Sequence, residues 1–204
     1  MRKLWGRANS VNVQKAMWAL EELGLAYERV DAGGAHGVVH DPAYRALNPN
    51  GLVPVLEEDG FALWESNAIL RYLAAAHGGP LALPGDLRER ALLEQWLDWQ
   101  ATTFTPAMRD AFWQTFRAPE PDRMLIAASI SATERCAAIL DRHLEGRSAM
   151  VGETFGIADI AVGCAAHRWL NIPVEKQERP NIRRWLSGIA ARPAAACVVT
   201  QPLS

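Results

Sequence analysis

Two pairs of polar residues have the types needed to hold an anion at the start of a helix. Ser10 and Asn12 precede one helix-like stretch, and Glu65 and Ser66 precede another. Backbone N–H groups are unpaired at a helix N-terminus and the helix dipole is positive there, so a hydroxyl at that point suits a carboxylate or a thiolate. Serine and asparagine are also ordinary N-cap residues, and capping alone explains either pair.

The chemistry at the two pairs would differ. Glu65 could take an ammonium while Ser66 takes a carboxylate, and an α-amino acid head group carries both. At Ser10, lowering a thiol pKa from about 8.5 by about two units requires roughly 2.7 kcal/mol of preferential stabilisation of the anion. One charge-assisted hydrogen bond of about 1.5 to 3 kcal/mol, together with the helix end, is sufficient.

Pro54 interrupts the apolar run Leu52 to Leu56, where a central strand would lose a hydrogen bond. Proline is accepted at a sheet edge or beside a cis peptide bond. If Val53–Pro54 is cis, the main-chain N–H and C=O of Val53 face outward and could pair with an extended, peptide-like ligand. The alternative is that Pro54 only protects the edge from aggregation.

These residues lie in a stretch with mixed strand and helix patterns. Alternating runs predict strands, Asp59-Gly60 predicts a tight hairpin turn, and apolar residues three and four apart predict helices. The expected strands are 4–5, 27–30, 53–56 and 61–64, and the expected helices are 13–23 and 66–77. The order βαβ followed by ββα is typical of a thioredoxin-like α/β domain, which we place at residues 1–79.

The rest of the chain has a helical pattern. Glycines and prolines mark a linker at 80–85, and residues 86–204 are predicted to form an all-helical bundle domain. Its helices are expected from 86 to a kink or end at Pro106, over 122–145, from about 156, and over 181–191. Asp159 is expected to accept a free backbone N–H near the helix cap at Gly156.

Composition argues against several classes of protein. The 21 basic and 23 acidic residues give a formal charge of −2 and are well mixed, so nucleic acid and anionic membranes are not expected partners. No apolar run approaches the roughly 18 residues of a membrane helix, and no signal-peptide core follows Met1, which predicts a cytoplasmic protein. Three cysteines without a CxxC favour buried thiols, and five scattered histidines predict no metal site.

Four motifs, taken in order, resemble those of the cytosolic glutathione transferases. They are Ser10-x-Asn12-x-x-Lys15, Asn48-Pro49-Asn50-Gly51-Leu52-Val53-Pro54, Glu65-Ser66-Asn67-Ala68-Ile69-Leu70 and Gly156-Ile157-Ala158-Asp159-Ile160. The resemblance implies that the backbone of Val53, before a cis Pro54, binds the cysteinyl part of glutathione. It implies that Glu65 and Ser66 bind the γ-glutamyl head. It also implies a homodimer formed through the first two long helices.

The thiol-activating group separates the branches of that family. The first tyrosine is Tyr27 and the first cysteine is Cys136, so neither stands near residue 10. Ser10 is therefore the residue near the end of the first strand that can donate a hydroxyl hydrogen bond to the thiol, as in serine-type members of the theta or phi kind. The spacing from Ser10 to Asn12 also resembles bacterial nu-type transferases, in which both residues contact the thiol and disulfide reduction is common. We predict Ser10 as the primary catalytic residue and Asn12 as its assistant.

Leu52 stands where the family often has Lys or Gln in contact with the glycyl end of glutathione. Only the backbone of Leu52 remains for that contact. His40 or His36 in the glycine-rich loop could compensate, although loop histidines are commonly just solvated. Recognition of the glycyl carboxylate is therefore open.

The predicted reaction is attack of the glutathione thiolate on a small hydrophobic electrophile, with the proton released to water because no general base is evident. Phe104, Trp113 and Phe116 are the expected contacts to the electrophile, with core packing or the subunit interface as the alternative role. Two other functions stay open. One is glutathione-dependent reduction of disulfides or peroxides at the same site, and the other is a non-catalytic binding or scaffold protein with this fold.

Overall fold

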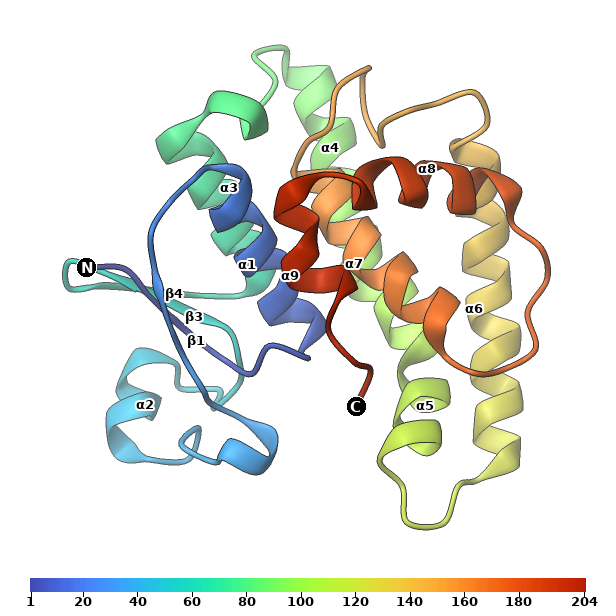
Figure 1. Ribbon diagram of the computed structural model, residues 1–204, viewed down its shortest axis with the longest axis horizontal. Coiled ribbons are helices and arrows are strands. Elements are labelled where there is room, and N and C mark those ends of the chain that lie inside the picture. The colour runs from blue at the N-terminus through green and yellow to red at the C-terminus, as the bar shows by residue number, and fades with distance from the viewer. The chain divides into compact units, whose positions relative to one another are not determined.

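The computed structural model describes residues 1–204, and their packing divides the chain into two compact units. Unit 1 consists of Met1–Leu83 and Pro193–Gln201, and unit 2 consists of Pro84–Arg192 and Pro202–Ser204. The sequence-based division placed residues 193–204 with the helical part, whereas residues 193–201 pack with the mixed α/β part. This segment contains the short helix α9 (Ala196–Val199), which lies beside α1 (Val11–Glu22) (Figure 1).

Unit 1 is built on a four-stranded mixed sheet. Its strands are β1 (Lys3–Trp5), β2 (Glu28–Val30), β3 (Val55–Glu58) and β4 (Phe61–Trp64), in the order β2-β1-β3-β4. β1 runs parallel to β2 and antiparallel to β3, and β3 and β4 form the predicted hairpin around Asp59 and Gly60. The thioredoxin-like prediction for this part of the chain is confirmed in element order and in sheet topology.

Alternating side chains give this sheet two packed faces. Leu4 and Leu56 are opposite each other in register and fully buried, on the face covered by α1 and α3 (Ser66–His77). Val55 points the other way, into a cluster with Tyr44. Tyr44 belongs to α2 (Pro42–Leu47), which the sequence did not predict because six residues are too few to show a helical period.

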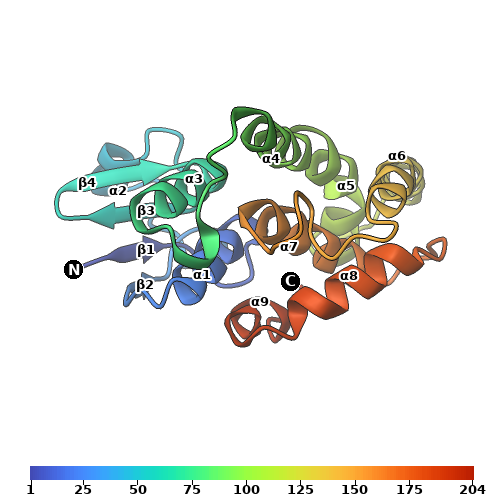
Figure 2. The same ribbon diagram turned by 90° about the horizontal axis from the view of Figure 1, so that it is seen from above.

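Unit 2 is all helical. Its helices are α4 (Leu87–Trp99), α5 (Thr105–Phe116), α6 (Arg123–His143), α7 (Ile157–Asn171) and α8 (Pro180–Ala190). α5 and α6 run side by side in both views (Figures 1 and 2). The helix that was expected to kink or end at Pro106 is interrupted just before it. A π-helical turn, Gln100–Phe104, separates α4 from α5, and Pro106 lies in the first turn of α5. No helix in either unit combines the length and apolar character needed to span a membrane.

Asp159, in the first turn of α7, is the polar centre of unit 2. It is 1% exposed, and its carboxylate accepts backbone N–H groups of Gly156 at 3.0 Å and Met150 at 2.9 Å. The expected bond to a free backbone N–H is thus confirmed. The indole N–H of Trp185 also donates to Asp159, at 2.9 Å, and ties α8 to α7. Burial raises the pKa of Asp159 to about 6, and these donors oppose that rise.

Candidate functional site

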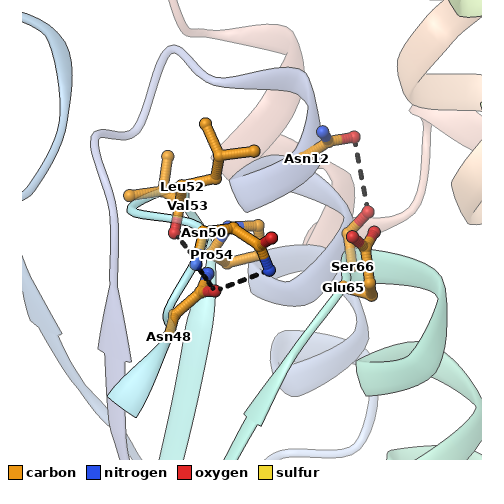
Figure 3. Close-up of a pocket in the computed structure, with 8 residues that line it drawn as sticks. All are labelled: Asn12, Asn48, Asn50, Leu52, Val53, Pro54, Glu65 and Ser66. Atoms are coloured by element: carbon orange, nitrogen blue, oxygen red, sulfur yellow. Dashed lines mark hydrogen bonds between the residues drawn. The ribbon is translucent and has the colours of Figure 1, made fainter. Parts of the chain in front are cut away.

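A pocket in unit 1 gathers residues from three of the sequence motifs (Figure 3). Its walls come from the start of α1, the loop between α2 and β3, and the start of α3. The lining residues are Asn12, Asn48, Asn50, Leu52, Val53, Pro54, Glu65 and Ser66. Six of these were proposed from sequence, and Asn48 and Asn50 were not. The fold brings Asn12 and Ser66 together across 54 positions of the chain.

The Val53–Pro54 peptide bond is cis, as the family resemblance implied. Pro54 is buried and stands just before β3, so its missing N–H leaves no gap in the sheet. Val53 lies outside the strands, and its main-chain N–H and C=O have no hydrogen-bond partner in the chain. Both groups are therefore available for main-chain pairing with an extended ligand.

Asn48 holds the turn that leads to Val53. Its side chain donates to the Leu52 carbonyl at 2.8 Å, and its Oδ1 accepts from the backbone and side-chain nitrogens of Asn50, both at 3.0 Å. The Tyr44 hydroxyl donates to the same Leu52 carbonyl, also at 2.8 Å. Two donors saturate that carbonyl. Only the N–H of Leu52 is left for a ligand.

A chain of hydrogen bonds runs from a buried lysine to the pocket wall. Lys15 is 1% exposed, and its Nζ donates to Ser66 Oγ at 3.3 Å and to Asn67 Oδ1 at 3.1 Å. The Ser66 hydroxyl donates in turn to Oδ1 of Asn12 at 3.3 Å. In Figure 3 the oxygen of the Asn12 amide points toward Ser66 and its nitrogen points away. That nitrogen is left to donate to a ligand.

Glu65 has an unusual backbone for a residue that is not glycine. Its φ of 70° lies in the left-handed region, which raises the energy by about 1 to 3 kcal/mol. Its side chain is exposed, has no partner in the chain and stands beside Ser66 at the pocket. Backbone strain of this kind concentrates at ligand sites. Glu65 is thus a carboxylate positioned for a cationic group.

Ser10 is the N-cap residue of α1, yet its hydroxyl makes no capping hydrogen bond. Capping therefore does not explain this serine. The residue is 8% exposed and is not among those that line the pocket, although Asn12, two positions later, is. Its hydroxyl remains able to donate to an anion near the start of α1.

The histidines proposed for the glycyl end lie off the pocket wall. His40 is exposed, and its Nδ1 lies 3.3 Å from Nη2 of Arg45. His36 lies 3.8 Å from the carboxylate of Asp31. Asn50 lines the pocket and neither histidine does, so a role for either histidine stays a prediction.

The three aromatic residues proposed for the electrophile belong to unit 2 and differ in exposure. Phe104 is fully buried, with its ring stacked on Trp99 at 5.1 Å between centroids. Trp113 is 50% exposed, and Phe116 is partly buried against Phe112. Their contact with a second substrate stays a prediction.

Sequence reasoning assigned no role to Lys15 or Asn48, although both lie inside the quoted motifs. The signal for Lys15 is its place between apolar neighbours of α1, Val13 and Ala16, since a lysine is almost never fully buried without a partner. The signal for Asn48 is weaker, because asparagine is common in any turn.

Family models cover most of the chain. The model described as the N-terminal domain of glutathione S-transferase matches residues 4–81, and the model of its C-terminal domain matches residues 104–193. Glutathione S-transferase GstB of Escherichia coli (strain K12) is 40% identical over 208 residues, with 100% of both chains covered. Disulfide-bond oxidoreductase YfcG of the same strain is 30% identical and covers 92% of this chain and 89% of its own.

Solved structures agree with these sequence matches. The theta class glutathione S-transferase from Xanthomonas axonopodis pv. citri, determined with glutathione bound, matches with a TM-score of 0.95 at 41% identity. The match covers 100% of this chain and 99% of that one. Glutathione transferase F7 from Populus trichocarpa matches with a TM-score of 0.87 at 27% identity, over 98% of each chain. Both similarities include the two units.

Proposed function

We propose that this chain, which belongs to the glutathione S-transferase family, binds glutathione in the unit 1 pocket and transfers its sulfur to a small hydrophobic electrophile. One observation carries the proposal: Val53, whose main-chain N–H and C=O are unpaired, lines the same pocket as Glu65 and Ser66. A tripeptide that begins with an α-amino acid head group matches both features.

The γ-glutamyl head belongs at the start of α3. Its carboxylate is favoured there by the backbone N–H groups of the first turn and by the ammonium of Lys15 behind them, which donates to the Ser66 hydroxyl. Its ammonium pairs with Glu65. The cysteinyl residue forms main-chain hydrogen bonds with Val53, in the manner of an added strand.

The cysteinyl sulfur lies toward the start of α1. The Ser10 hydroxyl and the amide nitrogen of Asn12 both donate to the thiolate, which lowers the thiol pKa and keeps the anion populated near neutral pH. The proton leaves to water. The sulfur attacks the electrophilic carbon and a C–S bond forms. The bond between that carbon and the leaving group breaks, and the leaving group departs with its electron pair.

Reduction of disulfides or peroxides with glutathione is the second candidate. Asn12 lines the pocket whereas Ser10 does not, which favours thiol contact through the amide, and YfcG is named as a disulfide-bond oxidoreductase. No cysteine lines the pocket, so a mixed disulfide would be resolved by a second glutathione. A binding or scaffold role without catalysis is the remaining alternative.

One set of measurements separates the three functions. Calorimetric titration with glutathione is expected to show binding that Glu65→Gln weakens. Conjugation of 1-chloro-2,4-dinitrobenzene is compared with thiol–disulfide exchange on hydroxyethyl disulfide. Conjugation as the faster reaction supports transfer, and exchange far above conjugation would identify a reductase. Binding with neither reaction would identify a scaffold, and absence of binding would overturn the proposal.

We also infer a cytoplasmic homodimer that forms through α4 and α6. Mixed surface charge and the buried thiols Cys136 and Cys164 suit a reducing compartment. Both helices carry exposed apolar side chains, which are Leu87, Leu92, Met124 and Leu125. Sedimentation of the wild type beside a variant with Leu92→Glu and Leu125→Glu tests the dimer.

A further inference from the structure

We propose that Arg7 makes this site prefer electrophiles that carry an anionic group, such as a carboxylate, near the reacting carbon. The inference rests on the proposed conjugation of glutathione and names the class of second substrate. Arg7 lies in the segment between β1 and α1, three positions before Ser10. No sequence motif included it.

The Arg7 side chain lies across two glycines. A Cβ added to Gly33 would lie 3.2 Å from Nη1 of Arg7, and one added to Gly34 would lie 3.3 Å from its Cδ and 3.5 Å from its Nε. Both glycines have positive φ, 78° and 62°, so other residues would be strained there. The missing side chains leave a flat surface for the guanidinium. Packing against this surface holds Arg7 in place.

No group of the chain pairs with this guanidinium. Arg7 is partly buried, and its side chain makes no hydrogen bond or ion pair. Burial alone lowers the pKa of Arg7, and no neighbouring carboxylate counteracts it. Asp31 precedes Ala32, whose carbonyl accepts the Arg7 N–H, but its carboxylate is already paired with Arg29 and lies 3.8 Å from His36. A fully buried charge is almost never left unpaired, and the buried part of this guanidinium would gain in the same way from a ligand anion.

The position of Arg7 points to the electrophile. A Cβ on Gly33 would also lie 3.4 Å from Cγ1 of Val53, so the guanidinium and the Val53 side chain share one glycine. Val53 lines the pocket, whereas Arg7 and Gly33 do not, so the guanidinium lies beside the pocket and not in it.

The backbone links the same cation to the thiol end of the site. The Arg7 carbonyl accepts the N–H of Ser10 at 3.1 Å, which places the cation on the segment that carries the thiol-activating hydroxyl. In the proposed arrangement, an electrophile that reaches the sulfur along this segment would come within reach of the guanidinium.

The test uses two aryl halides that differ in charge, 2-chloro-5-nitrobenzoate and 2-chloro-5-nitrobenzamide, in which the carboxylate or amide is ortho to the reacting carbon. In both, glutathione sulfur bonds to the ring carbon and chloride leaves. Arg7→Met is expected to lower kcat/KM for the benzoate by about tenfold or more, the effect of one charge-assisted hydrogen bond, and for the benzamide by less than about twofold. Arg7→Lys should restore part of the loss. Arg142→Met, which removes an exposed charge from α6, is the matched control.

Several outcomes would overturn the inference. Equal losses on both electrophiles would mean that Arg7 only packs. A rise in the KM for glutathione that disappears with its glycyl ethyl ester would mean that Arg7 binds the glycyl carboxylate.

Binding of the two preformed S-aryl conjugates, measured by calorimetry, gives a second readout that needs no turnover. Tighter binding of the carboxylate conjugate, lost in Arg7→Met, supports the inference. Equal binding of both conjugates overturns it and leaves glutathione conjugation intact. Binding of neither overturns the proposed function as well.

Discussion

The Ser66 hydroxyl donates a hydrogen bond to Oδ1 of Asn12 at 3.3 Å and so joins the start of α3 to the start of α1. The bond decides which side of the Asn12 amide is available, because its oxygen is occupied and its nitrogen is not. In the proposed mechanism the backbone N–H of Ser66 holds the γ-glutamyl carboxylate, and Asn12 contacts the sulfur. The residue that binds the head of glutathione therefore also orients, through its hydroxyl, a group that binds the thiol.

Ser66→Ala is expected to act at both ends of glutathione. Loss of the hydroxyl that accepts from Lys15 behind the carboxylate should raise the Kd for glutathione by up to about tenfold. Loss of the bond to Asn12 should also raise the pKa of the bound thiol, since the amide is no longer held. Calorimetry and the thiolate absorbance near 240 nm measure the two effects. Ser187→Ala on the exposed face of α8 is the control, and a change in Kd with an unchanged thiol pKa would refute the link through Asn12.

Ser10→Ala is expected to raise the pKa of the bound thiol by about one unit, which corresponds to about 1.4 kcal/mol. Asn12→Ala should raise it by less. Because the thiolate is the reactive form, each variant should lose most activity below the wild-type thiol pKa and recover at high pH. Titration of the thiolate and the pH profile of kcat/KM test this order. A larger shift in Asn12→Ala would make the amide the principal donor.

Much of this site could be predicted because its signals are local. Asp59-Gly60 specifies a hairpin turn, and Pro54 in an apolar run demands an edge or a cis bond. The roles of Lys15 and Arg7 were not predicted, because they depend on contacts with residues far along the chain, Ser66 and Gly33. A single lysine or arginine is expected to be an exposed surface charge unless a structure shows that it is buried.

Two short helices and the C-terminal segment could not be predicted from local sequence either. The six residues of α2 and the four of α9 are too short to carry a period. Nothing local indicates that residues 193–201 leave the helical unit and pack beside α1, because that choice depends on burial against a distant helix.

Lys15→Met tests whether the buried ammonium acts on glutathione through Ser66. We expect the Kd for glutathione to rise about tenfold, while stability changes little because a buried ammonium is costly to desolvate. A double-mutant cycle with Ser66→Ala should be non-additive by at least about 0.5 kcal/mol, since the two groups are in contact. Additive losses would show that Lys15 and Ser66 act separately.

Asp159 should make the stability of the chain depend on pH in an unusual direction. Burial raises its pKa from the ordinary 3.8 to about 6, so between these values the folded state holds the proton more tightly than the unfolded state. The contribution of this group to the free energy of unfolding therefore falls as pH rises from about 4 to about 6, by about 3 kcal/mol, and is constant above about 7.

The measurement is the free energy of unfolding in urea, for the wild type and for Asp159→Asn, between pH 4 and pH 7. The contributions of the other titrating groups cancel in the difference between the two proteins. The wild type should lose about 3 kcal/mol relative to the variant over that range. Trp185→Phe removes a donor that favours the carboxylate, so it should extend the decline to higher pH. A wild-type advantage that stays constant, or grows toward pH 7, would mean that the three donors outweigh burial and that Asp159 is ionised throughout.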